Sequence, residues 1–318
     1  MKRDFLSIDD FSPSELKETI ALASWLKRVR KTPLALCACK GSSMAMIFEK
    51  PSLRTRVTFE LAMVELGGHA FELSAIGVRL GQRESIPDVA RNLERWVDIL
   101  VARVFENKTV RELAANMRVP VINALCDREH PCQAVADLLT IAELSVERFP
   151  KVKLAFIGDG NNVCHSLILI SAALGLEMRV ATPKGYEPLP EYVARSKALC
   201  AASGGSLILT NDPEAAVSQA QFIYTDVWAS MGQEEESEKR KGLFQDFQLN
   251  STLLRCAAPD HYVLHCLPAH RGEEITDEVI DGPHSRVFDQ AENRLHAQKA
   301  IILKLLAPDI AERLSEGI

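Results

Sequence analysis

Residues 44–56, with the sequence MAMIFEKPSLRTR, decide how this chain folds. The apolar run Met44–Phe48 is short and dense enough to predict a buried β-strand. An α-helix is predicted over Leu53–Leu66, with Ser52 as the residue that caps its N-terminus. One face of this helix carries apolar residues at helical spacing, namely Val57, Leu61 and Val64. A buried strand that leads directly into a helix is the repeating unit of a parallel α/β sheet.

The same alternation of short β-rich runs and helical patterns continues along the chain. In the first half, the predicted strands are Met44–Phe48, His69–Leu73, Ile99–Ala102 and Val119–Asn123. In the second half, they are Val152–Ile157, Arg179–Ala181, Ser206–Thr210, Phe222–Thr225 and Val263–Cys266. Helical patterns separate them, near Pro87–Trp96, Val110–Met117, Pro131–Arg148, Val163–Leu174, Glu191–Ala202 and Pro213–Ala220. This alternation predicts parallel sheets covered by helices on both faces.

The alternation restarts after Pro150, which indicates two domains. We therefore expect an α/β protein with two doubly wound parallel-sheet domains joined by interdomain helices, the first spanning residues 1–148 and the second residues 149–291. A last helical pattern, Glu292–Leu306, lies beyond the second series and is compatible with packing on either domain. A length of 318 residues with 47% apolar and 25% charged residues fits two globular domains.

Composition also excludes several classes of protein. No apolar run reaches the length of about 18 residues that a membrane-spanning helix needs, and the N-terminus lacks the apolar core of a secretory signal. Eight cysteines in no tight framework predict reduced thiols in a cytoplasmic protein. A net charge of −6 disfavours nucleic acid as a partner, because phosphate backbones require a broad basic surface.

Polar, titratable and glycine residues follow the predicted strands of both series. In open parallel sheets, ligands bind beyond the carboxyl ends of the strands. The segments found there are Lys50–Arg56, Arg103, His130–Gln133, Gly158–Asn162, Asp226 with Ser230–Gly232, and Cys266–Arg271. We therefore expect functional residues along one edge of each sheet.

The segment Ser52–Arg56 predicts an anion site. The N-terminus of a helix carries partial positive charge, and Arg54 and Arg56 add two guanidinium groups that can bind phosphate bidentately. The alternative is a capped surface helix with two solvated arginines. The segment lacks the G-x-x-x-x-G-K-[ST] pattern of a P-loop, which disfavours nucleoside triphosphates.

Two other strand ends suggest groups that contact a substrate. Gly158–Asn162 resembles a dinucleotide-binding turn but lacks the third glycine, which disfavours NAD. Its two adjacent asparagines at a helix start suit the carboxylate and amino groups of an amino acid. His130 is either a histidine that caps a helix or, together with Gln133, a donor to a substrate carbonyl group.

Neither a metal site nor a Cys–His dyad is expected, and one charged segment leaves two interpretations open. Cys126, His130 and Cys132 fit no common zinc spacing. His265 and Cys266 are adjacent on a predicted strand and so point to opposite faces, which argues against a Cys–His dyad. The charged stretch Gln233–Gly242 predicts either a solvated loop or a lid.

Several motifs occur together in one order: Phe48–Arg56, His130–Gln133, Asp226–Gly232, His265–Pro268 and Phe288–Arg294. Over nearly the whole chain, they resemble the aspartate/ornithine carbamoyltransferase family. In that family, S-x-R-T-R and H-P-x-Q mark the carbamoyl phosphate domain, whereas S-M-G and H-C-L-P mark the ornithine branch.

The resemblance implies transfer of a carbamoyl group from carbamoyl phosphate to L-ornithine, which yields L-citrulline and phosphate. The neutral δ-amine would attack the carbamoyl carbon, without metal or cofactor, as a step of arginine metabolism such as arginine biosynthesis. The resemblance also implies a homotrimer with active sites at subunit interfaces, and a C-terminal helix over about residues 292–318 that returns to the first domain.

Site residues follow from the resemblance, motif by motif. Carbamoyl phosphate would contact Ser52, Leu53, Arg54, Thr55, Arg56, Arg79, Arg103, His130, Gln133, Cys266, Leu267 and Arg294. Ornithine would contact Asn162, Asp226, Ser230 and Met231. The catalytic residues would be Cys266, Arg103 and His130. Arg79 departs from the family pattern, because a glutamine that reaches the neighbouring subunit's carbamoyl phosphate usually stands there, and Leu53 replaces a common threonine.

Two alternatives to ornithine transfer remain. A carbamoyltransferase for another amine, such as putrescine, is disfavoured by Ser230-Met231-Gly232, the loop that closes over the α-groups of an amino acid. A catalytically silent binding subunit is disfavoured because the expected residue types stand at the catalytic positions.

Overall fold

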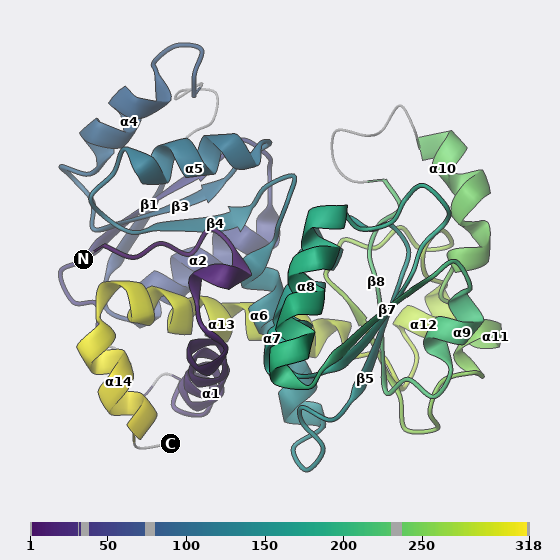
Figure 1. Cartoon of the computed structure of the whole chain (residues 1–318). Helices are drawn as coiled ribbons and strands as arrows, with labels where there is room; N and C mark the ends of the chain where they lie inside the picture. Colours follow the sequence, from purple (N-terminus) through teal and green to yellow (C-terminus); the bar gives the residue numbers. More distant parts are fainter. Residues whose placement is uncertain (1, 31, 33–37, 74–79, 230–236, 317–318) are drawn as a thin grey trace. The chain divides into compact units, whose positions relative to one another are not determined.

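The computed structural model describes residues 2–30, 32, 38–73, 80–229 and 237–316 (Figure 1). The chain divides into two compact units, which we call unit 1 (residues 1–139 and 292–318) and unit 2 (residues 140–291). Among the described residues, we find no helix with the length and apolar character needed to span a membrane.

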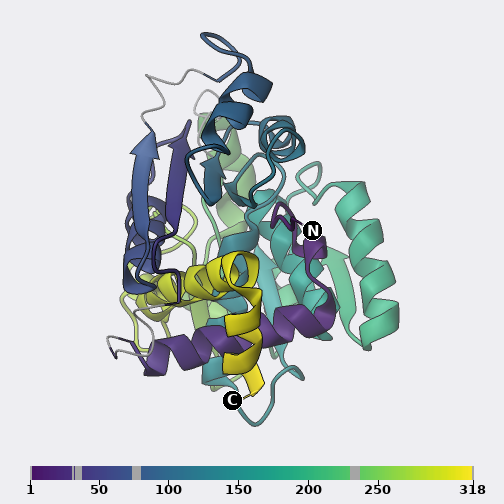
Figure 2. The same ribbon diagram turned by 90° about the vertical axis from the view of Figure 1, so that its left-hand side faces the viewer.

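Unit 1 contains a parallel sheet of four strands in the order β2–β1–β3–β4. The strands are β1 (Ser43–Phe48), β2 (His69–Leu73), β3 (Ile99–Arg103) and β4 (Val121–Leu125). Its helices are α1 (Pro13–Arg28), α2 (Leu53–Glu65), α4 (Ile86–Leu93), α5 (Asn107–Ala115) and α14 (Pro308–Glu316), together with parts of α6 (Pro131–Leu144) and α13 (Val287–Leu306). The C-terminal helix α14 packs against α1 (Figure 2).

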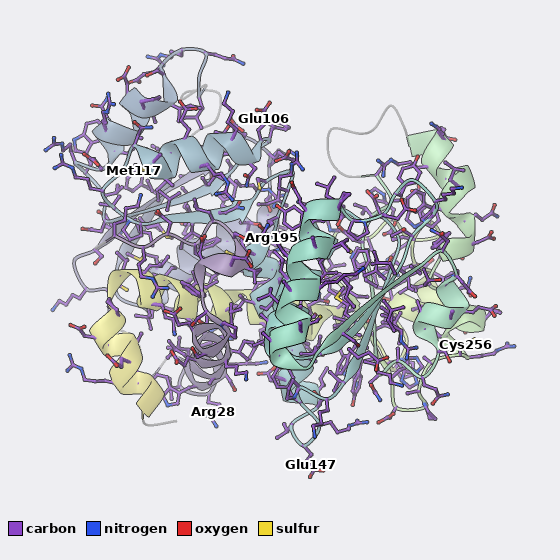
Figure 3. The ribbon with its side chains drawn as sticks, viewed as in Figure 1. Arg28, Glu106, Met117, Glu147, Arg195 and Cys256 are labelled. Carbon is purple, nitrogen blue, oxygen red and sulfur yellow. The ribbon has the colours of Figure 1, made fainter. Side chains whose placement is uncertain are left out.

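Unit 2 contains a parallel sheet of five strands in the order β7–β6–β5–β8–β9. The strands are β5 (Lys153–Ile157), β6 (Glu177–Ala181), β7 (Ser206–Thr210), β8 (Phe222–Thr225) and β9 (Tyr262–His265). Its helices are α7 (Asn162–Leu174), α8 (Pro190–Ser203), α9 (Pro213–Val217), α10 (Ser237–Phe244), α11 (Ser251–Leu254) and α12 (Asp277–Ile280). Helices α7 and α8 pack together, and α8 carries Arg195 (Figure 3). The guanidinium carbon of Arg195 lies 4.9 Å from the ring centre of Tyr192.

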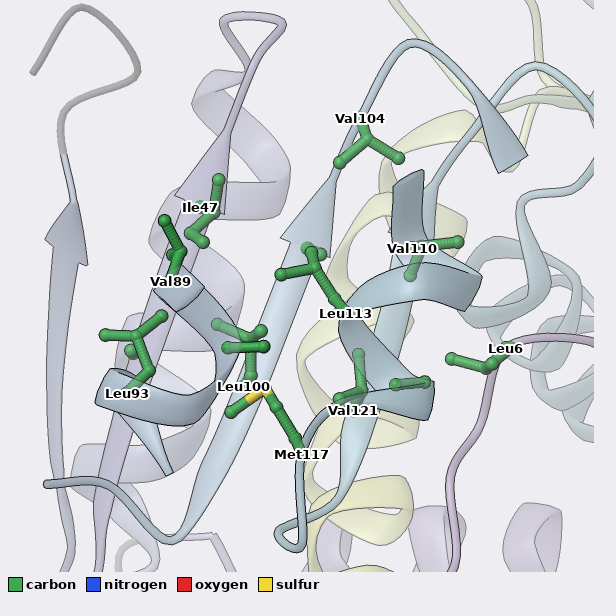
Figure 4. Close-up of a cluster of buried hydrophobic side chains, with 14 of the residues drawn as sticks. Leu6, Ile47, Val89, Leu93, Leu100, Val104, Val110, Leu113, Met117 and Val121 are labelled. Carbon is green, nitrogen blue, oxygen red and sulfur yellow. The ribbon is translucent and has the colours of Figure 1, made fainter. Parts of the chain in front are cut away.

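Alternate residues of the central strands build the core of unit 1. Ala45 and Ile47 of β1 pair in register with Leu100 and Ala102 of β3, and all four lie in one buried cluster. Helices α4 and α5 cover this face and contribute side chains such as Leu93 and Leu113 (Figure 4). The strand period of two thus places one set of side chains under these helices.

The predicted α/β class with two parallel sheets is confirmed, and the bounds of some elements differ. Strand β4 begins at Val121 rather than Val119, because Pro120 has no N–H group for the strand ladder. Helix α13 begins at Val287, five residues before the predicted start at Glu292, since Val287 is buried in the core of unit 2.

The apolar stripe predicted on α2 does not face the core. Val57, Leu61 and Val64 are 41%, 40% and 50% exposed. The helix instead buries Phe59 and Met63, which are fully inaccessible. The stripe is therefore a surface feature of unit 1.

Helix α13 contributes a buried polar cluster to unit 1. His296 is fully buried, and its pKa is lowered to about 3 by burial and then by the positive charges of Lys299, Lys27 and Arg30. Lys299 and Arg30 both pair with Glu65 at the end of α2. His296 is therefore neutral in the folded protein near neutral pH.

Acid should destabilise the fold through His296. The ordinary histidine pKa of 6.5 exceeds the folded value of about 3, so the unfolded chain binds a proton between these pH values that the folded chain does not. Lowering the pH from 7 to 5 should remove about 2 kcal/mol of unfolding free energy through this residue. We expect His296→Leu to lose that part of the pH dependence in urea unfolding at the two pH values.

The half-exposed His270 provides the control for this measurement. His270→Gln should keep the pH dependence of the parent chain. Equal pH dependence in the parent chain and in His296→Leu would contradict the assignment.

Candidate active site

Both sheets reverse their strand order at one point, and predicted site residues follow the strands there. In unit 1, the chain moves from β1 to β2 and then returns to the other side of β1 with β3. Ser52 and Thr55 follow β1, and Arg103 ends β3. In unit 2, the reversal lies between β5, which precedes Asn162, and β8, which precedes Asp226. Such switch points are where open α/β sheets bind ligands.

In unit 1, Thr55 joins three elements through its buried hydroxyl group. Ser52 caps α2, accepts a hydrogen bond from the Thr55 N–H at 3.3 Å and donates to Thr55 Oγ1 at 2.9 Å. Arg294 of α13 donates to the same hydroxyl oxygen at 2.7 Å, and Arg103 of β3 at 3.4 Å. The guanidinium groups of a strand end and of a distant helix therefore meet at the N-terminus of α2.

His130 lies close to this cluster, just before α6. Burial lowers its pKa well below the ordinary 6.5, and the positive charges of Arg294, Arg103 and Arg54 lower it further. The imidazole is therefore neutral and can donate a hydrogen bond through one ring nitrogen. Gln133, one turn along α6, is fully buried and donates from Nε2 to Asp137 at 2.7 Å.

These groups are arranged to stabilise an anion. Three guanidinium groups, a helix N-terminus and a neutral imidazole donor act at one place in unit 1. Arginine binds phosphate and carboxylate oxygens bidentately, and the helix dipole adds to that attraction. A dianion would relieve the mutual repulsion of the arginines.

Other residues predicted for this site are not part of the cluster. Arg56 points away and pairs with Glu72 of β2, with 2.6 Å between Nε and Oε2. Leu53 opens α2 with its side chain 76% exposed. Arg79 lies outside the described residues.

In unit 2, Asp226 is held from several sides just after β8. Its Oδ1 accepts hydrogen bonds from the Val227 N–H at 2.9 Å and the Cys266 thiol at 3.0 Å. Its Oδ2 accepts from Asn161 Nδ2 at 2.8 Å. Asn161 caps α7 through its side-chain oxygen, so its NH₂ group is the end turned toward Asp226. Asn162 is the first residue of that helix.

His265 and Cys266 have different hydrogen-bond partners. His265 Nδ1 accepts from the Leu267 N–H at 2.8 Å, and its Nε2 lies 3.1 Å from Glu274. Leu267 has a φ of +58°, a conformation that leucine rarely adopts and that is characteristic of functional sites. The His265–Glu274 pair therefore holds the backbone of Leu267 in place.

The ligand atoms of Asp226, His265 and Cys266 lie within 4.8 Å of one another, close enough for a metal ion. Both ring nitrogens of His265 are already engaged, by Leu267 and Glu274. A metal ion there would have to displace one of these hydrogen bonds.

Sequence reasoning missed the residues that hold the site residues in place. These are Glu274, Gln290 (which accepts from the His265 N–H at 2.8 Å) and Arg240. Asn161 was expected to suit the polar groups of an amino acid, but its hydrogen bond to Asp226 was not predicted. Gln290 lies within the quoted motif Phe288–Arg294, which was the available signal for it. The predicted residues Ser230 and Met231 lie outside the described residues.

Comparison with known proteins agrees with this geometry. The family model for the carbamoyl-P binding domain of aspartate/ornithine carbamoyltransferase matches residues 3–143, and the model for the Asp/Orn binding domain matches residues 150–305. The chain thus belongs to the aspartate/ornithine carbamoyltransferase family, a family of enzymes that transfer carbamoyl groups. This confirms the family predicted from the sequence motifs.

Within that family, the similar proteins are ornithine carbamoyltransferases. The enzyme named so in Methanosarcina acetivorans is 52% identical, over 96% of this chain and 100% of the relative. The one in Anoxybacillus flavithermus is 49% identical, over 96% of each chain. The solved ornithine carbamoyltransferase structure from Pyrococcus furiosus superimposes with a TM-score of 0.93 at 49% identity, covering 96% of this chain and 97% of that one.

Proposed function

We propose that this chain transfers the carbamoyl group of carbamoyl phosphate to L-ornithine, giving L-citrulline and phosphate for arginine biosynthesis. The observation that carries the proposal is the convergence of Arg103 and Arg294 on Thr55, beside a neutral His130. Similarity to ornithine carbamoyltransferases over nearly the whole chain supports ornithine as the acceptor.

In unit 1, the proposed ligand is carbamoyl phosphate. Ser52, Arg54 and Thr55 would hold its phosphate at the N-terminus of α2, where the backbone N–H of Leu53 is also available. The groups around the carbonyl oxygen and the carbamoyl nitrogen would be Arg103, Thr55, His130, Gln133 and Arg294. Arg56, which pairs with Glu72, is left out of this contact set, and the assignment of Arg79 rests on the sequence resemblance alone.

In unit 2, the proposed ligand is ornithine. Asp226 offers a carboxylate to the α-ammonium group, and Asn162 stands at the start of helix α7, next to the Asn161 that bonds Asp226. Cys266 and Leu267 are assigned to the δ-amine and the carbamoyl group. Ser230 and Met231 complete this set on the basis of the sequence motif.

The chemistry requires a neutral amine. A free δ-amine has a pKa near that of lysine, about 10.4, so the enzyme must favour its deprotonated form. The amine nitrogen forms a bond to the carbamoyl carbon, the bond from that carbon to the phosphate oxygen breaks, and the leaving phosphate can accept the amine proton. Arg103 and His130 would stabilise the negative charge that develops on the carbonyl oxygen.

The test is formation of the carbamoylated amine and of phosphate at pH 8, with ornithine, putrescine, aspartate and N-acetylornithine offered in parallel with carbamoyl phosphate; only ornithine gives citrulline. Turnover confined to ornithine is the expected result. Turnover of putrescine would favour the alternative transferase. Carbamoyl phosphate binding without turnover of any amine would favour the silent subunit.

Cys266 is proposed to orient the δ-amine and to assist its deprotonation. Cys266→Ala removes a thiol that donates to Asp226, and hydrogen bonds to charged groups contribute about 1.5–3 kcal/mol. We expect kcat/KM for ornithine to fall about 10- to 100-fold. Cys256→Ala, beyond the end of α11 (Figure 3), is the matched control and should keep full activity. Unchanged kcat and KM in Cys266→Ala would remove this role.

The proposed assembly is a homotrimer. Exposed apolar side chains of unit 1 include Val57, Leu61 and Val64 on α2 and Phe71, which is 42% exposed, on the edge strand β2 that α2 contacts. Contiguous exposed apolar surface is typical of protein–protein interfaces. The mass measured by light scattering tests this assembly.

The proposed location is the cytoplasm, since the seven cysteines among the described residues form no disulfide.

A further inference from the structure

The charged stretch Gln233–Gly242 contains one arginine that is not solvated. Arg240 lies on α10 and is only 6% exposed, although the composition of this stretch predicts a loop too polar for burial. Its Nη1 donates to Asp159 Oδ2 at 2.9 Å and to the Trp228 carbonyl oxygen at 2.8 Å. The guanidinium carbon also lies 4.8 Å from the ring centre of Tyr186 and 6.0 Å from that of Phe244.

Arg240 therefore joins the loops that follow three strands of the unit 2 sheet. Asp159 belongs to the loop after β5, Tyr186 to the loop after β6, and Trp228 to the segment after β8. The loops after β5 and β6 are also packed closely, because the Gly160 N–H donates to the Tyr186 carbonyl oxygen at 2.8 Å. A Cβ atom on Gly160 would come within 2.3 Å of the Pro188 nitrogen, so only glycine fits there.

The two partners of Arg240 lie close in sequence to the proposed ornithine-binding residues Asn162 and Asp226 and to the supporting residue Asn161. Asp159 is two residues before Asn161, and Trp228 is two residues after Asp226. Asn161 and Asp226 are themselves joined by a hydrogen bond of 2.8 Å. The loop after β5 and the segment after β8 are thus connected twice. One connection is the hydrogen bond from Asn161 that orients the Asp226 carboxylate, and the other is the Arg240 guanidinium group.

We propose that Arg240 is a positioning residue for ornithine recognition, which fixes the loop after β5 against the segment after β8. The inference rests on the proposed function and deepens it. Arg240 does not contact the substrate in this account; it acts through Asp159 and the Trp228 carbonyl. Removing a buried partner of an ion pair leaves the other charge uncompensated, so Asp159 would then draw in water and shift its loop.

The test separates the KM for ornithine from the KM for carbamoyl phosphate. In Arg240→Gln, we expect the KM for ornithine to rise at least about tenfold, while the KM for carbamoyl phosphate and kcat at saturating ornithine change less than about threefold. Lys241→Gln is the matched control, because Lys241 is the next residue of α10 and pairs at the surface with Glu238 and Glu273. It should behave as the parent chain.

Chemical rescue distinguishes positioning from general damage. In Arg240→Ala, low millimolar guanidinium chloride should lower the KM for ornithine toward the parent value, since the ion can occupy the place beside Asp159. Arg240→Lys, which keeps the charge but not the planar fork, should show an intermediate KM and remains testable if Arg240→Ala does not fold.

Three results would overturn the proposal. They are an unchanged KM for ornithine in Arg240→Gln, an equal loss for both substrates, and no rescue by guanidinium in a folded Arg240→Ala protein. Failure of the proposed function is distinct, because the parent chain would then form no citrulline.

Discussion

The Arg103→Gln variant is expected to lose about 10²- to 10³-fold in kcat/KM for carbamoyl phosphate and to melt at a higher temperature than the parent chain. Arg103 and Arg294 are 9% and 3% exposed, and together with Arg54 they lower the pKa of the buried His130. Without an anion, these positive charges repel one another. Removing one charge relieves repulsion, while the transition state loses a preorganised donor.

Two measurements check this expectation. Thermal melting without ligand should give a Tm about 2 °C or more above that of the parent chain. Added phosphate should raise the Tm of the parent chain more than that of the variant, because at equal concentration the ligand that binds more tightly stabilises the folded state more. Arg118→Gln, in which a side chain 84% exposed is replaced, is the control and should leave activity and Tm unchanged. A lower Tm together with full activity would contradict the assignment.

The fold could be predicted because each element has local signals. The sequence Ser12–Glu15 has the pattern of a capping box and forms one at the start of α1, and the predicted bounds of β7 and β8 agree with the structure. The alternation of strands and helices along the chain then predicted parallel sheets. Several ends were misplaced, among them the starts of β4, β6, α5 and α13.

The loops that carry the site could also be predicted, because parallel strands place their carboxyl ends on one edge. Side-chain directions were harder. Arg54 and Arg56 are two residues apart on α2, which rotates them by about 200° around the helix axis, so both cannot face one anion. This geometry was available from the sequence. That Arg56 is the one turned away depends on Glu72 of β2, a contact that local sequence does not specify.

The supporting residues could not be predicted, because their partners are far away in the sequence. Asn161 bonds Asp226 across 65 positions, and Arg240 bonds Asp159 across 81. The composition around Arg240 indicates a solvated surface, and only the folded chain shows that Asp159 and Trp228 surround its guanidinium group. One charged residue among the many of a charged stretch carries no local sign of such a contact.

The largest effect on the acceptor substrate is expected from Asp226→Asn, which should raise the KM for ornithine about 10²- to 10³-fold. Losing one partner of a buried charge pair costs about 2–5 kcal/mol. The asparagine would keep the size of the aspartate but not its charge. Both aspartate oxygens accept hydrogen bonds, so a new NH₂ group would also face either the Asn161 NH₂ group or the Val227 N–H and the Cys266 thiol.

The loss could come from a missing contact with the α-ammonium group or from disorder of the loop around Asn161 and Cys266. An ornithine analogue separates these two causes. 5-Aminopentanoate keeps the reacting amine and the carboxylate but lacks the α-ammonium group. If Asp226 binds that ammonium group, the parent chain should use the analogue poorly, and Asp226→Asn should cost little further activity with it. An equal loss with ornithine and with the analogue would instead mean that Asp226 orders the loop around Asn161 and Cys266. The interaction between the substitution and the missing ammonium group therefore measures the contact itself, in the manner of a double-mutant cycle.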